Sequence, residues 1–110
     1  MPAKIVKIAD LQPTDTLRQP TVSFLETLDP KGMRALGLPQ VWETPKGLLI
    51  SDGNQRAAVL AKKGHEHIEV DYNHADNAPA YFLSCLEIVK ARAGAMQRQG
   101  IHSPYDLWAA

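Results

Sequence analysis

The spacing of apolar and polar positions along the chain predicts three strand regions. An apolar run over residues 5–8 ends before Pro13, which indicates an N-terminal strand. Residues 40–43 and 47–51 are rich in apolar side chains and flank a Thr-Pro-Lys-Gly turn signal, so they predict a β-hairpin. Residues 67–72 alternate between apolar and polar side chains, a pattern typical of a strand with one exposed face.

Helical spacing alternates with these strands. Apolar positions over residues 22–28 predict a short helix, and residues 29–37 predict a second one, from an Asp-Pro start signal to a closing glycine. A third helix is expected over 54–63. The longest one is expected over 77–99, with a single apolar stripe. The stripe consists of Phe82, Cys85, Leu86, Val89, Ala93 and Met96.

This mixture of elements predicts an α+β fold with mixed strands, in one domain that spans residues 1–110. The expected core covers about residues 5–72, and the long C-terminal helix with its tail covers about 77–110. Tyr105 and Trp108 lie so close to the end of the chain that we expect the tail to dock on a surface.

Composition narrows the function classes. Of 110 residues, 45% are hydrophobic and 22% charged, and twelve basic side chains balance twelve acidic ones. This balance argues against a protein that binds DNA by charge alone, because counterion release requires unopposed Lys and Arg. No run reaches the roughly 18 apolar residues of a membrane span, and residues 1–10 lack the apolar centre of a signal peptide. With one cysteine, the chain is expected to be cytoplasmic.

Candidate chemistry is concentrated in residues 48–58, which combine a strand, a tight turn and a helix start. The first N–H groups of a helix have no partner within the helix, and Gly53 would let an anion approach them. Arg56 could add a bidentate contact to phosphate. The alternative is purely structural: Asp52 caps the helix, Gly53 forms a turn, and Arg56 is exposed or paired with Asp52. A carboxylate beside phosphate would be better explained if it held Mg²⁺ or deprotonated a hydroxyl.

The order of these segments resembles the ParB/sulfiredoxin superfamily over about residues 5–72. The resemblance rests on Gly-Leu-Pro-Gln-Val at 37–41, a hairpin, Ile-Ser-Asp-Gly-Asn-Gln-Arg-Ala-Ala at 50–58, and Ile-Glu-Val at 68–70. The opening segment, 6–13, is similar to the first strand and proline turn of those domains. The resemblance implies a compact fold in which a Gly-x-x-Arg turn holds nucleotide phosphates. Members include the CTP-binding domain of ParB, ATP-using sulfiredoxin and an ADP-dependent serine kinase.

Carried over by position, the implied phosphate-binding residues are Gly53, Asn54, Gln55 and Arg56. Asp52 resembles the Asp that precedes the same Gly in the kinase branch. That branch also needs a carboxylate base from the N-terminal half, for which Glu26 is the candidate by position. The implied cofactor is ATP, ADP or CTP, with Mg²⁺.

The chain also departs from the family. Sulfiredoxin has a reactive cysteine before a His-Arg pair, where this chain has Asn54 and Gln55, so sulfiredoxin chemistry is not expected. The second arginine-rich segment and the helix-turn-helix domain of ParB have no counterpart in these 110 residues. Cys85 falls on the apolar stripe and is expected to be a small buried side chain.

No metal site is predicted. His65, His67 and His74 could be imagined as three ligands, but a closed zinc site requires a fourth.

Three hypotheses for the function follow. The first is a nucleotide- or phosphate-binding domain, with Mg²⁺-dependent phosphoryl transfer or phosphate-ester hydrolysis if it is catalytic. The second is a non-catalytic interaction module that forms a homodimer through its C-terminal helix, whose small residues at 91–95 would admit a second helix closely. The third, which the charge balance disfavours, is a DNA-associated partition or nuclease-like accessory protein.

Overall fold

A computed structural model describes residues 2–109 and shows a mixed five-stranded sheet in the order β1-β5-β3-β4-β2. The strands are β1 (Ala3–Lys7), β2 (Leu11–Gln12), β3 (Gln40–Thr44), β4 (Gly47–Asp52) and β5 (His67–His74). β1 runs antiparallel to β5 and β3 antiparallel to β4, whereas β2 is parallel to β4 and β3 is parallel to β5.

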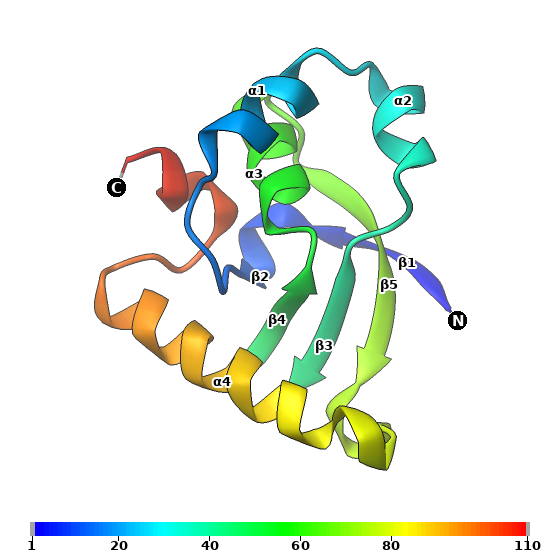
Figure 1. Ribbon diagram of the computed structural model, residues 1–110, viewed down its shortest axis with the longest axis vertical. Helices are drawn as coiled ribbons and strands as arrows, with labels where there is room; N and C mark the ends of the chain where they lie inside the picture. The colour runs from blue at the N-terminus through cyan, green and yellow to red at the C-terminus, as the bar shows by residue number, and fades with distance from the viewer. Residues whose placement is uncertain (1, 110) are drawn as a thin grey trace.

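Four α-helices accompany the sheet: α1 (Gln19–Glu26), α2 (Pro30–Ala35), α3 (Asn54–Lys62) and α4 (Leu83–Arg98). Short 3-10 helices lie at Ile8–Asp10, Ala75–Asn77, Ala80–Phe82 and Pro104–Trp108. Figure 1 shows α1 and α2 above the sheet, α3 at its upper end and α4 crossing its lower part. The predicted α+β class with a long C-terminal helix is confirmed.

The two faces of the sheet pack against different helices. Val41 and Ile50 belong to the core cluster that includes Ala57 of α3. Trp42 and Leu49, one position along each strand, lie on the opposite face, since side chains alternate along a strand. There Trp42 stacks on Phe82 just before α4, with ring centroids 4.7 Å apart. The sheet is therefore covered by α3 on one face and, in part, by α4 on the other.

The predicted N-terminal strand divides in two. β1 ends at Lys7, and the 3-10 turn that follows sends the chain to β2 at the opposite edge of the sheet. Ile8 and Leu11 are fully buried around this crossing. An apolar run indicates burial, but it does not indicate which edge of a sheet receives it.

The long-helix prediction needs two corrections. α4 begins at Leu83 and not near Asn77, because residues 75–82 form two 3-10 helices separated by Pro79. Ala78 is extended, with ψ of 132°, as expected for a residue before proline. Cys85 is exposed and does not belong to the buried side of α4. The buried residues of α4 are Leu86, Ala93 and Met96, a narrower stripe than the one predicted.

The prediction that the C-terminal tail docks on a surface is confirmed, and the surface belongs to the tail's own domain. Leu107 packs in one cluster with Ala58 of α3 and Met96 of α4. Trp108 Nε1 donates a hydrogen bond to the Ala58 carbonyl at 2.8 Å. Within residues 2–109, no helix combines the length and apolar character needed to span a bilayer.

Candidate functional site

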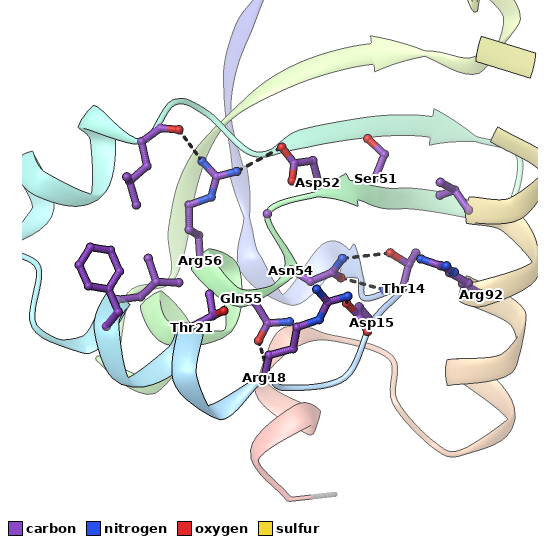
Figure 2. Close-up of a pocket in the computed structure, with 15 residues that line it drawn as sticks. Thr14, Asp15, Arg18, Thr21, Ser51, Asp52, Asn54, Gln55, Arg56 and Arg92 are labelled. Carbon is purple, nitrogen blue, oxygen red and sulfur yellow. Dashed lines mark hydrogen bonds and ion pairs between the residues drawn. The ribbon is translucent and has the colours of Figure 1, made fainter. Parts of the chain in front are cut away.

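A cavity of about 450 Å³ lies where β4 ends and α3 begins (Figure 2). Its walls come from the 14–18 segment, from α1, from the β4–α3 turn and from α4. The predicted strand, turn and helix start over residues 48–58 are confirmed, and they form the floor of this cavity.

Gly53 makes the sharp turn into α3. Its φ is +98°, and a Cβ there would lie 2.6 Å from Pro39 Cβ and 2.9 Å from Pro39 Cα. Both the backbone angle and the contact with Pro39 therefore require glycine. α3 begins with no side-chain cap, so the amides of its first turn remain available at the cavity. The helix dipole adds partial positive charge at the same place.

The side chains of Asn54 and Gln55 form hydrogen bonds within the protein. Asn54 Oδ1 accepts from the Thr14 amide at 2.8 Å, and its Nδ2 donates to Thr14 Oγ1 at 3.0 Å. Gln55 Oε1 accepts from the Arg18 amide at 2.8 Å, while its Nε2 donates to the Thr16 carbonyl at 2.7 Å. The two residues fasten the 14–18 segment to the start of α3 (Figure 2). Only their backbone amides remain for the predicted phosphate contact.

Arg56 is anchored inside the fold. Its Nη1 donates to the carbonyls of Gly37 at 2.7 Å and Leu36 at 3.2 Å, directly after α2. Its Nη2 lies 3.5 Å from Asp52 Oδ2. The side chain is 12% exposed, whereas that of Asp52 is 72% exposed. The structural ion pair considered as an alternative is thus present, and Arg56 still brings its charge to the cavity wall.

Two further arginines line the cavity, and sequence reasoning missed both. Arg18 comes from the start of α1 and pairs with Asp15 at 2.7 Å. Arg92 comes from α4, and none of the ion pairs among residues 2–109 involves it. Three arginines against two aspartates leave one net positive charge on the lining. No sequence signal could have found Arg18 or Arg92, because only the folded chain brings them to the cavity that Arg56 lines.

The two predicted catalytic carboxylates separate in space. Asp52 lies on the cavity wall. Glu26 does not line the cavity, and its Oε1 pairs with Lys62 Nζ at 3.0 Å. The structure therefore does not bring Glu26 to Asp52, and the second carboxylate of the cavity is Asp15.

Part of the cavity wall is apolar and exposed. Phe24 is 55% exposed and Leu36 is 49% exposed, and both line the cavity. A charged floor and an apolar wall within one cavity suit a ligand with both kinds of group.

Among residues 2–109, no group of three His, Cys, Asp or Glu side chains is close enough to hold a metal ion. His67 and His74 lie at opposite ends of β5, so the three histidines are not brought together.

Comparison with known proteins gives a fold without a function. No family model matches the chain, and no curated protein matches it. Among solved structures, the chain is similar to the crystal structure of protein Atu1540 from Agrobacterium tumefaciens, with a TM-score of 0.53 and 19% sequence identity. The match covers 79% of this chain and 47% of that one, so the chain spans about half the length of Atu1540. At this identity the two proteins share a fold, and nothing further follows.

Proposed function

We propose that this domain binds a phosphate-bearing small molecule, specifically a nucleotide such as ATP, ADP or CTP, in the cavity at the start of α3. The observation that carries the proposal is the convergence of Arg18, Arg56 and Arg92, from three separate elements, around an uncapped helix N-terminus. Backbone amides and arginines together are the usual protein partners of phosphate. The resemblance of residues 50–58 to the phosphate turn of ParB/sulfiredoxin domains supports the same assignment.

The parts of the cavity would have different roles. The first amides of α3 would donate to phosphate oxygens, and Arg92 and Arg18 would balance their charge. Arg56 is held by two carbonyls, so its main role would be to fix the α2–β3 connection beside the phosphate. Phe24 and Leu36 would contact the less polar part of the ligand.

A nucleotide would bring Mg²⁺ with it, and Asp15 and Asp52 fit that requirement in part. Two carboxylates within a phosphate site are unfavourable unless a cation stands between them and the phosphates. Asp52 is exposed at the cavity, so its oxygens can reach a cation held mainly by the ligand. If the domain is catalytic, the chemistry would be phosphoryl transfer or phosphate-ester hydrolysis, with Asp52 as metal ligand or base. Glu26 does not line the cavity and therefore has no part in this proposal.

Thermal unfolding with ATP, ADP, CTP, GTP and inorganic phosphate, each with and without Mg²⁺, tests the proposal. A ligand at 100 times its Kd stabilises the folded state by about 2.7 kcal/mol. For a domain of this size, the melting temperature would rise by roughly 10 °C. Arg92→Ala should reduce the shift to about half, because tenfold weaker binding leaves about 1.4 kcal/mol of stabilisation at the same ligand concentration. Arg98→Ala, an exposed arginine on the same helix, should retain the full shift. If no nucleotide or phosphate shifts the wild type, the proposal is wrong.

The competing proposal is a protein-interaction module, and one observation favours it. Leu83 and Ile88 of α4 are 50% and 53% exposed, so two large apolar side chains of this helix face solvent. Because the aromatic tail packs on its own domain, α4 is the surface that would form a homodimer or bind another protein. Light scattering distinguishes the cases: a monomer at all concentrations, unchanged by Ile88→Ser, would exclude the homodimer.

A further inference from the structure

A second cavity, also of about 450 Å³, lies where β5 ends and the chain turns toward α4. Its lining comes from β3, from the end of β5 and from the two 3-10 helices before α4. Figure 1 shows the chain between β5 and α4, in yellow-green, beneath the arrowheads of β3 and β5. None of its lining residues also lines the cavity at the start of α3.

The floor of this second cavity is aromatic and rigid. Trp42 stacks on Phe82 with ring centroids 4.7 Å apart and an interplanar angle of 17°. Trp42 is 6% exposed, and its Nε1 donates to Ser51 Oγ at 3.2 Å. Each ring covers one face of the other, and Trp42 is buried, so Trp42 offers no free face to a ligand. The most exposed ring of the lining is Tyr81, which is 83% exposed.

The polar groups around this ring are carboxamides. Gln40, Asn73 and Asn77 all line the cavity. Asn73 Nδ2 donates to the carbonyls of Val41 and Asp71, which fixes the amide and leaves its Oδ1 to accept from a ligand. Carboxamides donate and accept equally well, so they suit ligand groups that also do both.

Charge is nearly absent from the lining. It contains no Lys, Arg, Asp or Glu, and its one titratable imidazole, His74, is bound through Nδ1 to Glu43 at 2.6 Å. An anion would find no cation to pair with here, and a cation would find no lining carboxylate. The ligand that fits is therefore uncharged.

We infer that this cavity binds a neutral sugar ring. A pyranose has an apolar C–H face, which matches the exposed ring of Tyr81, and a rim of hydroxyls, which matches the carboxamides of Gln40, Asn73 and Asn77. The volume lies within the range of about 300–1,000 Å³ seen for small-molecule sites.

The test is a titration of the ¹⁵N-labelled protein followed by NMR. The probes are glucose, galactose, mannose, N-acetylglucosamine and maltose, with adenosine and cytidine as uncharged nucleosides. A sugar should shift the indole N–H of Trp42 and the side-chain NH₂ signals of Gln40, Asn73 and Asn77, with a Kd on the order of 1 mM. The NH₂ signal of Asn54, in the first cavity, should stay in place.

Three variants decide whether the ring face matters. Tyr81→Ala should weaken sugar binding by about tenfold or more, because it removes the stacking surface. Tyr81→Phe keeps that surface and should retain binding. Ile88→Ala, an exposed apolar residue of α4 outside the cavity, should bind as the wild type does. Tyr81 and Ile88 are both exposed, so all three variants should melt as the wild type does.

Several outcomes would overturn the inference. These are no shift with any sugar, shifts that persist in Tyr81→Ala, and binding of nucleosides alone. Self-association of the free protein through Tyr81, detected as concentration-dependent broadening of the same signals, would assign the surface to a second copy instead.

Discussion

The two cavities have the same volume, about 450 Å³ each, but their linings differ in chemistry. The first, at the start of α3, combines backbone amides with three arginines from distant parts of the chain. The second uses rings and carboxamides, most of them from neighbouring residues between 73 and 82. The first therefore depends on a backbone turn and on long-range electrostatics. The second depends on local packing, so the two should respond differently to mutation and salt.

The largest expected effect is at Gly53. Gly53→Ala would force a Cβ to 2.6 Å from Pro39 at a φ of +98°. Strain and overlap together should destabilise the fold by about 3 kcal/mol and distort the first cavity. Chemical denaturation measures the loss. Gly64→Ala is the matched control, because its φ is +87° and nothing lies within 4 Å of the added methyl. An equal loss in both variants would mean that Pro39 is not the cause.

The next effect separates the arginines of the first cavity. Arg56→Ala removes hydrogen bonds from a largely buried guanidinium to two carbonyls, and should destabilise the fold by about 2 kcal/mol. Arg92→Ala breaks no ion pair found within residues 2–109 and should leave stability within about 0.5 kcal/mol. Its effect should appear as about tenfold weaker nucleotide binding. The assignment fails if Arg92→Ala lowers stability as much as Arg56→Ala does.

A smaller effect is expected from salt, which should weaken ligand binding in the first cavity and leave it unchanged in the second. Raising the ionic strength from about 0.01 M to about 1 M shortens the Debye length from ~30 Å to ~3 Å. Nucleotide binding at three arginines should weaken severalfold over this range. Sugar binding in the uncharged second cavity should stay constant. Titrations of both ligands in the same buffers make the comparison, and equal salt dependence would argue that one site binds both.

The smallest effect concerns pH and depends on Tyr72, which lines neither cavity. Burial raises the pKa of Tyr72, and the nearby Glu43 carboxylate raises it further. The unfolded chain therefore loses this proton first, near pH 10, and stability falls as pH rises from there through the folded-state pKa. Below pH 10 the contribution is fully present. Tyr72→Phe should reduce the loss, measured by denaturation between about pH 9 and 11. Sugar binding should not change, since Tyr72 does not line the second cavity.

Local signals predicted the elements that local physics controls. The Asp29 cap is confirmed, with its Oδ1 accepting from the Gly32 amide at 2.7 Å, and so is the left-handed Gly37 with a φ of +93°. The hairpin and α3 also form where they were expected. The predicted start of α4 near Asn77 was wrong because a 3-10 helix forms over Ala80–Phe82, after Pro79, and the α-helix begins only at Leu83.

In the candidate site, too, the features that depend on nearby residues were predicted, and those that depend on distant residues were not. Residues 50–56 could be identified because a strand, a glycine turn and a helix start are close in sequence. Sequence reasoning gave Asn54 and Gln55 a ligand role, whereas their side chains are used to hold residues 14–18. Their partners are distant in sequence: Thr14 lies 40 residues from Asn54, and Arg18 lies 37 residues from Gln55. No local rule specifies such a pair.

Short-range sequence signals were enough to predict the caps, the left-handed turns, the α+β class and the place of the Gly-x-x-Arg turn, because each depends on interactions within a few residues. The tertiary structure places Arg18 and Arg92 in the lining of the same cavity as Arg56. It also pairs Glu26 with Lys62 and puts Tyr81 in one cavity with Gln40 and Asn73. These residues are brought together by the packing of the helices and strands. Many different sequences can satisfy the same packing, so it cannot be inferred from local sequence patterns. Charge and ring faces become sites only when packing brings them together.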